Sequence, residues 1–355
     1  MRGTTGLVLV CIIAAMSGYF VFSGMQKSTS FSGSDVEVYN RWRAEFNKLA
    51  ATPSENDFRM RVLIEKAKQI REWNAKYEKH VAEKGLPPLT GPMFGLNEWS
   101  DLTDEEFNKM YTGLRTDELE HLEVDKSLGY ELPVSNTDLG AGTYEYRVRE
   151  QRSCGSCWAF STVATLERQY FVRKAVQIDF SQQLLVDCSP NDSGCNGGNQ
   201  INTFEYVKTS GIQNAASYPY TATKNICKRQ ADKAIWFDNI FASKNILYTT
   251  TAAINAANKK ITPGLDVTTS GKFRSLSTTD DIFDASFSGE CDNGTSHAIN
   301  LASVGLDASN RRWVRILNSW GTGWGFKGMK KIYPCSETKL WGTPSYIIYS
   351  TNVTI

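Results

Sequence analysis

Histidine is scarce in this chain, and net charge is almost absent. The 355 residues contain only three histidines, His80, His121 and His297, and the formal net charge is +1. A nucleic-acid partner usually requires a strongly basic patch, which this composition does not indicate. So few histidines also offer few ligands for a metal. We therefore expect no nucleic-acid partner, no metal and no cofactor.

The eight cysteines are unevenly distributed. Cys11 lies in an apolar N-terminal stretch, and the other seven lie between Cys154 and Cys335. Seven is odd, so if six pair as disulfides one thiol remains. The alternative, seven buried thiols in a cytosolic protein, is disfavoured by the N-terminus.

Residues 3–25 carry no charge, as in a signal peptide, yet the run is also long enough to span a bilayer. We predict that residues 1–24 are a signal peptide or signal anchor, so the chain enters the secretory pathway, where disulfides persist. Membrane contact is expected only if the segment is a retained anchor.

A helical N-terminal part and a later mixed part are separated by a polar linker. Aromatic and aliphatic residues recur at helical spacing over residues 36–84, and the glycine and prolines of residues 85–88 end that helix. Thr103 with Glu106 forms a capping-box pattern for a short helix. Residues 112–143 are mostly polar, which suits an exposed linker that proteases cut.

After the linker, helical periodicity gives way to strand-like runs. Residues 157–174 predict a helix, which Ser156 could cap. Short apolar runs at residues 299–304, 313–317 and 345–349 are typical of strands. We therefore expect an α+β fold, with helices first and strands second.

One cysteine has the setting of a nucleophile. Cys157 begins the predicted helix, and both a helix N-terminus and a neighbouring imidazolium lower the pKa of a thiol. His80 and His121 precede or lie within the linker, so His297 is the one histidine that could serve as the base. The alternative, an inert buried thiol, is the usual state of a cysteine.

The local sequence decides between these two readings. Residues 151–161 (QRSCGSCWAFS) resemble the active-site segment of papain-like cysteine proteases. His297, in TSHA, and Asn318, in NSWGTGWG, follow 140 and 161 positions after Cys157, as the family has them. The resemblance implies a papain-like fold with a helical left domain, a β-barrel-like right domain and a cleft between them.

The resemblance also implies roles. Cys157 attacks the scissile carbonyl, His297 holds the thiolate and protonates the leaving amine, and Asn318 orients His297. Trp320 covers the His297–Asn318 bond, and Gln151 with the Cys157 N–H forms the oxyanion hole. The family's disulfides would be Cys154–Cys195, Cys188–Cys227 and Cys291–Cys335.

The N-terminal part resembles the family's inhibitory propeptide. Glu55, Arg59, Ile70 and Asn74 match its long-helix signature, whereas Leu63 and Lys66 depart from it. Residues 95–101 keep a second signature with Trp99 in place of Phe. We predict a signal segment at residues 1–24, an inhibitory propeptide at 35–107, an activation linker at 108–130 and a peptidase domain at 131–355.

The substrate pocket departs most from the family. Gly197 and Gly198 leave room for an extended substrate backbone, but the next two residues, usually apolar, are Asn199 and Gln200. Polar Thr295 and Ser296 precede His297. We expect one polar wall and a weaker preference for Leu or Phe, with a substrate-binding set of Gly155, Gly197, Gly198, Asn199, Gln200, Val267, Thr295, Ser296, Ala298 and Trp320.

We predict a cysteine endopeptidase made as a zymogen, inhibited by its own propeptide, activated in acid, and acting on peptides and proteins. Two alternatives are a transamidase or ligase using the same acyl-enzyme, and a non-catalytic storage or binding protein of the same fold. An acidic lysosome- or vacuole-like compartment, or secretion, suits the enzyme. Sequons at Asn191, Asn293 and Asn352 are candidate glycosylation sites.

Overall fold

The computed structural model describes residues 35–50, 52–116, 144–237, 264–336 and 339–342, and the backbone alone of residues 137–138, 241–245 and 347–351. The predicted signal segment, most of the predicted linker and Asn352 lie outside the described residues. Within them, no helix is long and apolar enough to cross a membrane.

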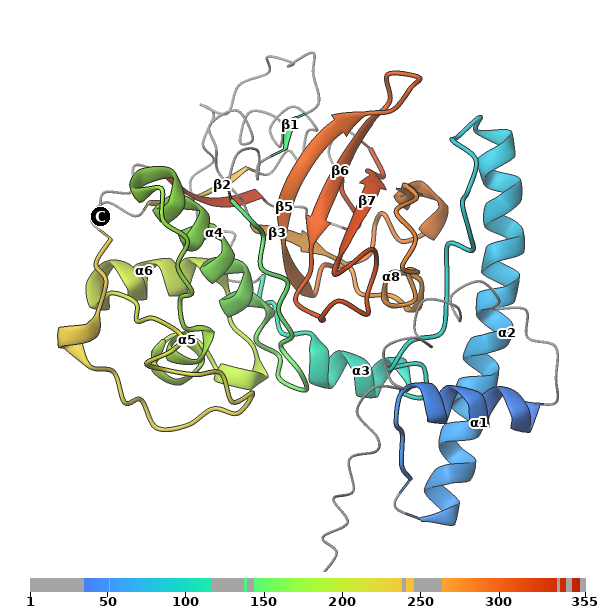
Figure 1. Cartoon of the computed structure of the whole chain (residues 1–355), viewed down its shortest axis with the longest axis horizontal. Coiled ribbons are helices and arrows are strands. Elements are labelled where there is room, and N and C mark those ends of the chain that lie inside the picture. Colours follow the sequence, from blue (N-terminus) through green and yellow to red (C-terminus); the bar gives the residue numbers. More distant parts are fainter. Residues whose placement is uncertain are drawn as a thin grey trace, which may run out of the picture.

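The N-terminal part forms three helices rather than two (Figure 1): α1 (Asp35–Glu45), α2 (Pro53–Glu83) and α3 (Asp104–Tyr111). The prediction of unbroken helix over residues 36–84 was wrong in its middle. Thr52 caps α2 by accepting a hydrogen bond from the Glu55 N–H at 3.1 Å, and Pro53 takes the first helical position, where its missing N–H costs nothing. The predicted capping box of Thr103 and Glu106 opens α3.

A helical lobe follows. It contains α4 (Cys157–Lys174), α5 (Gln182–Cys188) and α6 (Gln200–Ser210), with short 3₁₀ turns η4 (Gly194–Asn196) and η5 (Ala231–Lys233). The bounds of α4 are those predicted. Its inward residues, among them Trp158, Val163 and Leu166, join a core with α5 and α6. Disulfides Cys154–Cys195 and Cys188–Cys227 tie the lobe's loops together, in the pairing that the resemblance implied.

The second lobe is built on one sheet of eight strands, in the order β2-β8-β3-β5-β6-β7-β4, with β1 beside β5. All pairs are antiparallel except β4–β7. The predicted strands at residues 299–304 and 313–317 lie within β5 and β6, and the one predicted at 345–349 overlaps β8 at residues 347–349, its first two residues lying outside the described residues. The lobe also holds α8 (Gly271–Arg274), η6 (Ala285–Ser288) and the disulfide Cys291–Cys335. The strands are β1 (Thr137–Asp138), β2 (Phe241–Asn245), β3 (Gly264–Val267), β4 (Phe283–Asp284), β5 (His297–Leu306), β6 (Arg312–Leu317), β7 (Met329–Tyr333) and β8 (Ile347–Thr351).

The N-terminal helices share the core of the sheet lobe. Figure 1 shows α2 alongside this lobe and α3 running from α2 toward the helical lobe. Tyr77 of α2 and Phe107 of α3 are buried in the same apolar cluster as Phe283 and Trp320. The Tyr77 hydroxyl accepts from the Asp284 N–H at 2.8 Å. Burial of this kind of aromatic surface stabilises the docked segment strongly, since each large side chain contributes about 1.5–3 kcal/mol.

Candidate active site

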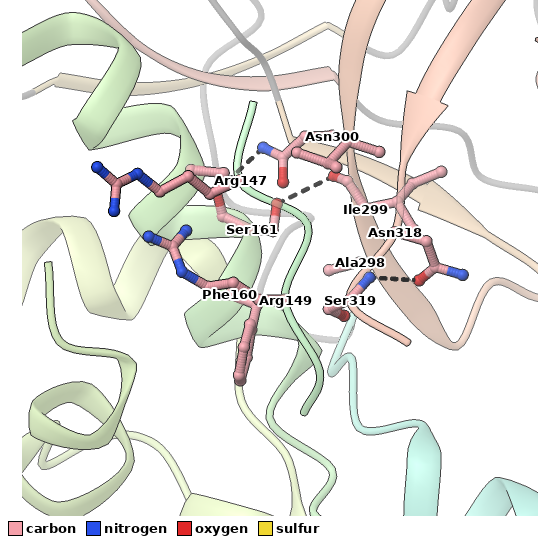
Figure 2. Close-up of a pocket in the computed structure, with 11 residues that line it drawn as sticks. Arg147, Arg149, Phe160, Ser161, Ala298, Ile299, Asn300, Asn318 and Ser319 are labelled. Atoms are coloured by element: carbon pink, nitrogen blue, oxygen red, sulfur yellow. Dashed lines mark hydrogen bonds between the residues drawn. The ribbon is translucent and has the colours of Figure 1, made fainter. Parts of the chain in front are cut away.

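The two groups expected to do the chemistry are the first residues of neighbouring elements. Cys157 opens α4 and His297 opens β5. The Ser161 hydroxyl of α4 donates to the Ile299 carbonyl of β5 at 3.0 Å, and the Asn300 amide donates to the Ser161 carbonyl at 3.0 Å (Figure 2). These bonds fix the register between helix and strand. They therefore fix the thiol relative to the imidazole.

Asn318 and Trp320 complete the surroundings of His297. Nε2 of His297 and Oδ1 of Asn318 lie 2.8 Å apart, so the amide oxygen accepts from the ring. The Trp320 ring stacks on the imidazole with centroids 4.5 Å apart. The same Asn318 oxygen accepts from the Ser319 N–H at 2.7 Å, which holds the amide in that orientation (Figure 2).

His297 is wholly buried in this state. Burial lowers its pKa from 6.5 to about 4, and the bond to Asn318 opposes that shift. Its Nδ1 has no hydrogen-bond partner among the described residues. The imidazole is therefore neutral at ordinary pH, and the thiolate–imidazolium pair required for attack is disfavoured.

Ser156, expected to cap α4, makes no capping bond. Its hydroxyl instead lies 2.7 Å from the Tyr220 hydroxyl. The Ser156 hydroxyl therefore does not accept a hydrogen bond from the first N–H groups of α4. Cys157 remains at the positive end of the helix, as the sequence predicted.

Gln151 is engaged by the N-terminal part of the chain. Its Nε2 donates to the Tyr111 carbonyl at 3.1 Å and to the Cys154 carbonyl at 2.8 Å. Its Oε1 accepts from the Ser319 hydroxyl at 2.7 Å. The expected oxyanion donor therefore already holds a peptide carbonyl, that of Tyr111.

The residues that follow α3 cross the cleft as an extended chain. Both Gly113 and Leu114 donate their N–H groups to the Ser296 carbonyl, at 3.3 and 3.1 Å. On the other side, Gly198 donates to the Gly113 carbonyl at 2.9 Å and accepts from the Arg115 N–H at 2.9 Å. Leu114 is buried against Cys157 and Ala298. The chain thus blocks its own nucleophile.

Three predicted glycines are required by close approach. A Cβ on Gly155 would lie 2.5 Å from the Thr112 carbonyl oxygen. A Cβ on Gly197 would lie 2.9 Å from the Gly113 oxygen, and Gly197 also has φ of 116°. At Gly198 the added atom would instead meet the Asp192 carboxylate, 2.5 Å away. Gly155 and Gly197 therefore face the cleft, whereas Gly198 presents its backbone to it.

The two side chains expected to form the polar wall, Asn199 and Gln200, make contacts at the start of α6. The Asn199 side chain accepts from the Ile201 and Asn202 N–H groups and so caps the helix. Gln200 is buried, and its amide lies 3.5 Å from the Ser161 hydroxyl. The oxygen of Asn199 is therefore committed to the backbone and is not available to a substrate.

The opposite wall combines apolar and hydroxyl groups. Val267 is buried in the sheet core, paired in register with His297, and Ala298 contacts Leu114. The Ser296 hydroxyl pairs with that of Thr269 at 2.8 Å. Thr295 is half-buried beside Ser296.

Residues 111–115, predicted only as part of the activation linker at 108–130, fill the cleft, and Ser319 was not predicted to take part in the site. The Thr-Gly pair at 112–113 was a usable signal, because a glycine in a polar linker fits where two backbones touch. Behind the site, a cavity of about 20 Å³ lies between α4 and β5 (Figure 2). Its size suits one water molecule and excludes a substrate.

Comparison with known proteins identifies two regions of the chain. Residues 136–347 match the papain family cysteine protease model, and residues 39–107 match the cathepsin propeptide inhibitor domain. A cathepsin L-like proteinase of Phaedon cochleariae is 32% identical over 307 residues, covering 85% of this chain and 89% of the relative. Papain of Carica papaya is 29% identical, covering 84% and 81%.

Solved structures agree in fold. Digestive procathepsin L 3 of Tenebrio molitor has a TM-score of 0.73 at 21% identity, covering 90% of this chain and 99% of that one. Procathepsin L2 from the same insect has a TM-score of 0.75 at 24% identity, covering 89% and 99%.

The chain therefore belongs to the papain family of cysteine proteases. It is the zymogen form, in which a cathepsin-type propeptide inhibitor domain precedes the peptidase. The residues that follow this domain, 111–115, occupy the cleft.

Proposed function

We propose that this zymogen matures into an endopeptidase that cleaves peptide bonds through a Cys157 acyl-enzyme. One observation carries the proposal: a peptide segment lies between Gly198 and Ser296 with the carbonyl of Tyr111 on Gln151 Nε2. The cleft thus binds extended backbone along both edges. A bound substrate would use the same donors and acceptors.

The chemistry follows from the site geometry. The Cys157 thiolate attacks the scissile carbonyl, and the oxyanion that forms is stabilised by Gln151 Nε2 and the Cys157 N–H. His297, held by Asn318, protonates the leaving amine. It then takes a proton from the water that splits the thioester, which restores the thiol.

The secretory route is part of the proposal. Three disulfides join six of the seven cysteines in the C-terminal part, and such bonds persist in oxidising compartments. The uncharged N-terminal stretch supplies the signal or anchor. We place the mature enzyme in an acidic lysosome- or vacuole-like compartment or outside the cell.

Acid would release the propeptide by protonating its carboxylates, and docking also depends on the charge of Asp104. Its carboxylate receives Arg274 Nη2 at 2.7 Å and Lys66 Nζ at 3.4 Å. Burial and the charge of Arg274 both lower the pKa of Lys66, whereas Asp104 opposes that change. Loss of the Asp104 charge would leave two buried cations facing each other across the propeptide–peptidase boundary, which favours separation. Lys66 departs from the family pattern, and its positive charge makes docking depend more strongly on the Asp104 charge than an asparagine would.

Two other carboxylates of the propeptide have pKa values shifted in opposite directions. Arg59 lowers the pKa of Glu106 through a 2.7 Å hydrogen bond, so this pair within the propeptide is lost only in stronger acid. Burial raises the pKa of Asp101, so this carboxylate takes up a proton at a higher pH than an exposed aspartate does. Nε2 of His80 in α2 lies 2.9 Å from the Asp284 carboxylate of the peptidase, so this contact also joins the two parts.

The enzymatic function is tested by labelling with an epoxide inhibitor of cysteine proteases, before and after acid treatment. We expect labelling only after acid, and none in Cys157→Ala. Labelling that survives the substitution would overturn the assignment of the nucleophile. Product analysis with an added amine separates hydrolysis from the transamidase alternative, and no turnover at all would indicate the storage or binding protein.

The acid switch has a matched control on the same helix. Asp104→Asn should process at a higher pH than the unaltered precursor, because it removes the carboxylate between Lys66 and Arg274. Glu105→Gln makes the same charge change at the adjacent exposed position and should leave the processing pH unchanged. Equal processing of all three proteins at neutral and acidic pH would count against acid activation.

Pocket preference is open to direct measurement. Because the Asn199 side chain caps α6, polar groups at the pocket would come from Thr295 and Ser296. We therefore propose that the pocket accepts substrates with polar side chains as well as those with Leu. Profiling the activated enzyme with a peptide library tests this. A strict Leu preference would contradict it.

A further inference from the structure

A tyrosine hydroxyl links the two halves of the oxyanion hole. The Tyr220 hydroxyl donates to the Gln151 backbone carbonyl at 2.8 Å and lies 2.7 Å from the Ser156 hydroxyl. Its single proton goes to Gln151, so Ser156 is the donor in the second bond. One side chain thus joins the residue that carries the side-chain donor to the residue before Cys157.

The ring that carries this hydroxyl is itself held in place. Phe160 of α4 packs edge-on against it with centroids 4.9 Å apart. The Arg152 guanidinium lies over the same ring, 5.4 Å from its centroid, and donates to the Tyr220 carbonyl at 3.0 Å. Burial raises the pKa of Tyr220 to about 12, so the hydroxyl keeps its proton over any working pH.

Local hydrogen bonds also tie the two joined segments. The Cys154 N–H donates to the Arg152 carbonyl at 2.8 Å, the Ser156 N–H donates to the Cys154 carbonyl at 2.7 Å, and Gln151 Nε2 donates to that same carbonyl at 2.8 Å. Ser156 makes no capping bond to α4. The Tyr220 bridge adds to these local bonds a link from a distant part of the chain that joins Gln151 to Ser156, and it thereby contributes to the distance between Gln151 Nε2 and the Cys157 N–H.

We propose that Tyr220 is a positioning residue for catalysis, which sets the spacing of the two oxyanion donors through Gln151 and Ser156. The proposal rests on the acyl-enzyme chemistry proposed above. Loss of a whole oxyanion donor slows an enzyme by about 10²–10³-fold, so loosening the spacing should slow it by about tenfold.

Tyr220→Phe removes the hydroxyl and keeps the ring. The matched control is Tyr218→Phe, because the Tyr218 hydroxyl also makes a bond in the helical lobe, to Asp187 at 2.9 Å, with no tie to the site. Three quantities are measured on the acid-activated enzymes. They are kcat and KM on a peptide substrate, affinity for a peptide aldehyde, and the pH profile of thiol reaction with 2,2′-dipyridyl disulfide.

The aldehyde and the disulfide separate positioning from general damage. The aldehyde's hemithioacetal oxygen uses the oxyanion hole, whereas the disulfide reagent needs only the thiolate–imidazolium pair. For Tyr220→Phe we expect kcat and aldehyde affinity to fall about tenfold, with KM and the disulfide profile within twofold. Tyr218→Phe should leave all of them within twofold.

Other results overturn the proposal. A parallel loss of all three quantities means that Tyr220 only supports the fold, and no loss means that the bridge does not set the spacing. If Tyr220→Phe cannot be produced in folded form, Ser156→Ala removes the other bond and must give the same selective loss. If the unaltered enzyme shows neither aldehyde binding nor disulfide reactivity, the acyl-enzyme function fails instead.

Discussion

Opening of the precursor's cleft should place one proton on His297 between pH 6.5 and about pH 4. In the docked state the buried imidazole has its pKa lowered to about 4. Once residues 111–116 leave, solvent reaches the ring and its pKa returns toward the ordinary 6.5. The docked form binds fewer protons in this window, so falling pH favours the open form.

The magnitude follows from the two pKa values. The difference between 6.5 and about 4 corresponds to about 3 kcal/mol. Propeptide affinity should therefore fall about tenfold per pH unit within the window, and on the order of 100-fold across it. In Cys157→Ala, which has no thiolate to hold the imidazolium, both forms are neutral at this position above pH 6.5, and His297 contributes no pH dependence there.

The scarcity of histidine makes the assay clean. NMR of histidine-labelled Cys157→Ala precursor follows three imidazoles, and His80→Gln and His121→Gln assign the other two. The remaining titration, that of His297, should have a midpoint near 4. After the linker is cut by an added protease and the propeptide is removed, the midpoint should rise toward 6.5. Cys157→Ala prevents self-processing and removes the thiolate from both measurements.

A second variant ties the proton to docking. In Cys157→Ala/His297→Gln, the dependence of propeptide affinity on pH between pH 4 and 6.5 should be weaker than in Cys157→Ala by about tenfold per pH unit, the slope that one proton contributes. A His297 midpoint near 6.5 in the intact precursor would refute the reasoning. So would identical pH slopes in the two proteins.

Three further outcomes are expected. His80→Ala should weaken propeptide docking about fivefold, because it removes the 2.9 Å contact of the imidazole Nε2 with Asp284; an unchanged inhibition constant for the isolated propeptide would contradict it. Gly113→Ala should weaken self-inhibition at least tenfold, since its Cβ would lie 2.3 Å from the Gly155 oxygen; inhibition constants at pH 7 check it, and an unchanged value contradicts it. Asn293 is exposed three residues before Ser296, so Asn293→Gln should remove one glycan from protein made in a secretory host and speed cleavage of folded substrates only; mass spectrometry and paired peptide and protein assays test this, and an unmodified Asn293 ends the idea.

Local signals in the sequence were sufficient for several elements. The bounds of α4 and the capping box of α3 follow from residues close together in the chain, and both were predicted. The break between α1 and α2 was missed because apolar spacing continues across it. Thr52 and Pro53, a cap followed by a residue suited to the first turn, were the signal that should have been weighed.

Side chains with two plausible partners were harder to predict. Ser156 precedes a helix and could cap it, but a hydroxyl 64 residues away in the chain, that of Tyr220, takes it instead. Asn199 was expected to face the pocket, yet two helix N–H groups closer to hand engage it. Polar groups follow the partner that satisfies most hydrogen bonds, and only the folded chain shows which one that is.

The sequence by itself determined the family of this protein and the chemistry available to it. A lone mature histidine, an odd cysteine at a helix start and two distant motifs were enough, because catalysis demands particular side chains at particular positions. The tertiary structure alone decided the state of the site. Residues 111–115 enter the cleft, bond to Ser296 beside the buried His297 and occupy Gln151, because α2 and α3 pack into the core of the sheet lobe. Contacts between segments so far apart in the chain leave no local pattern in the sequence.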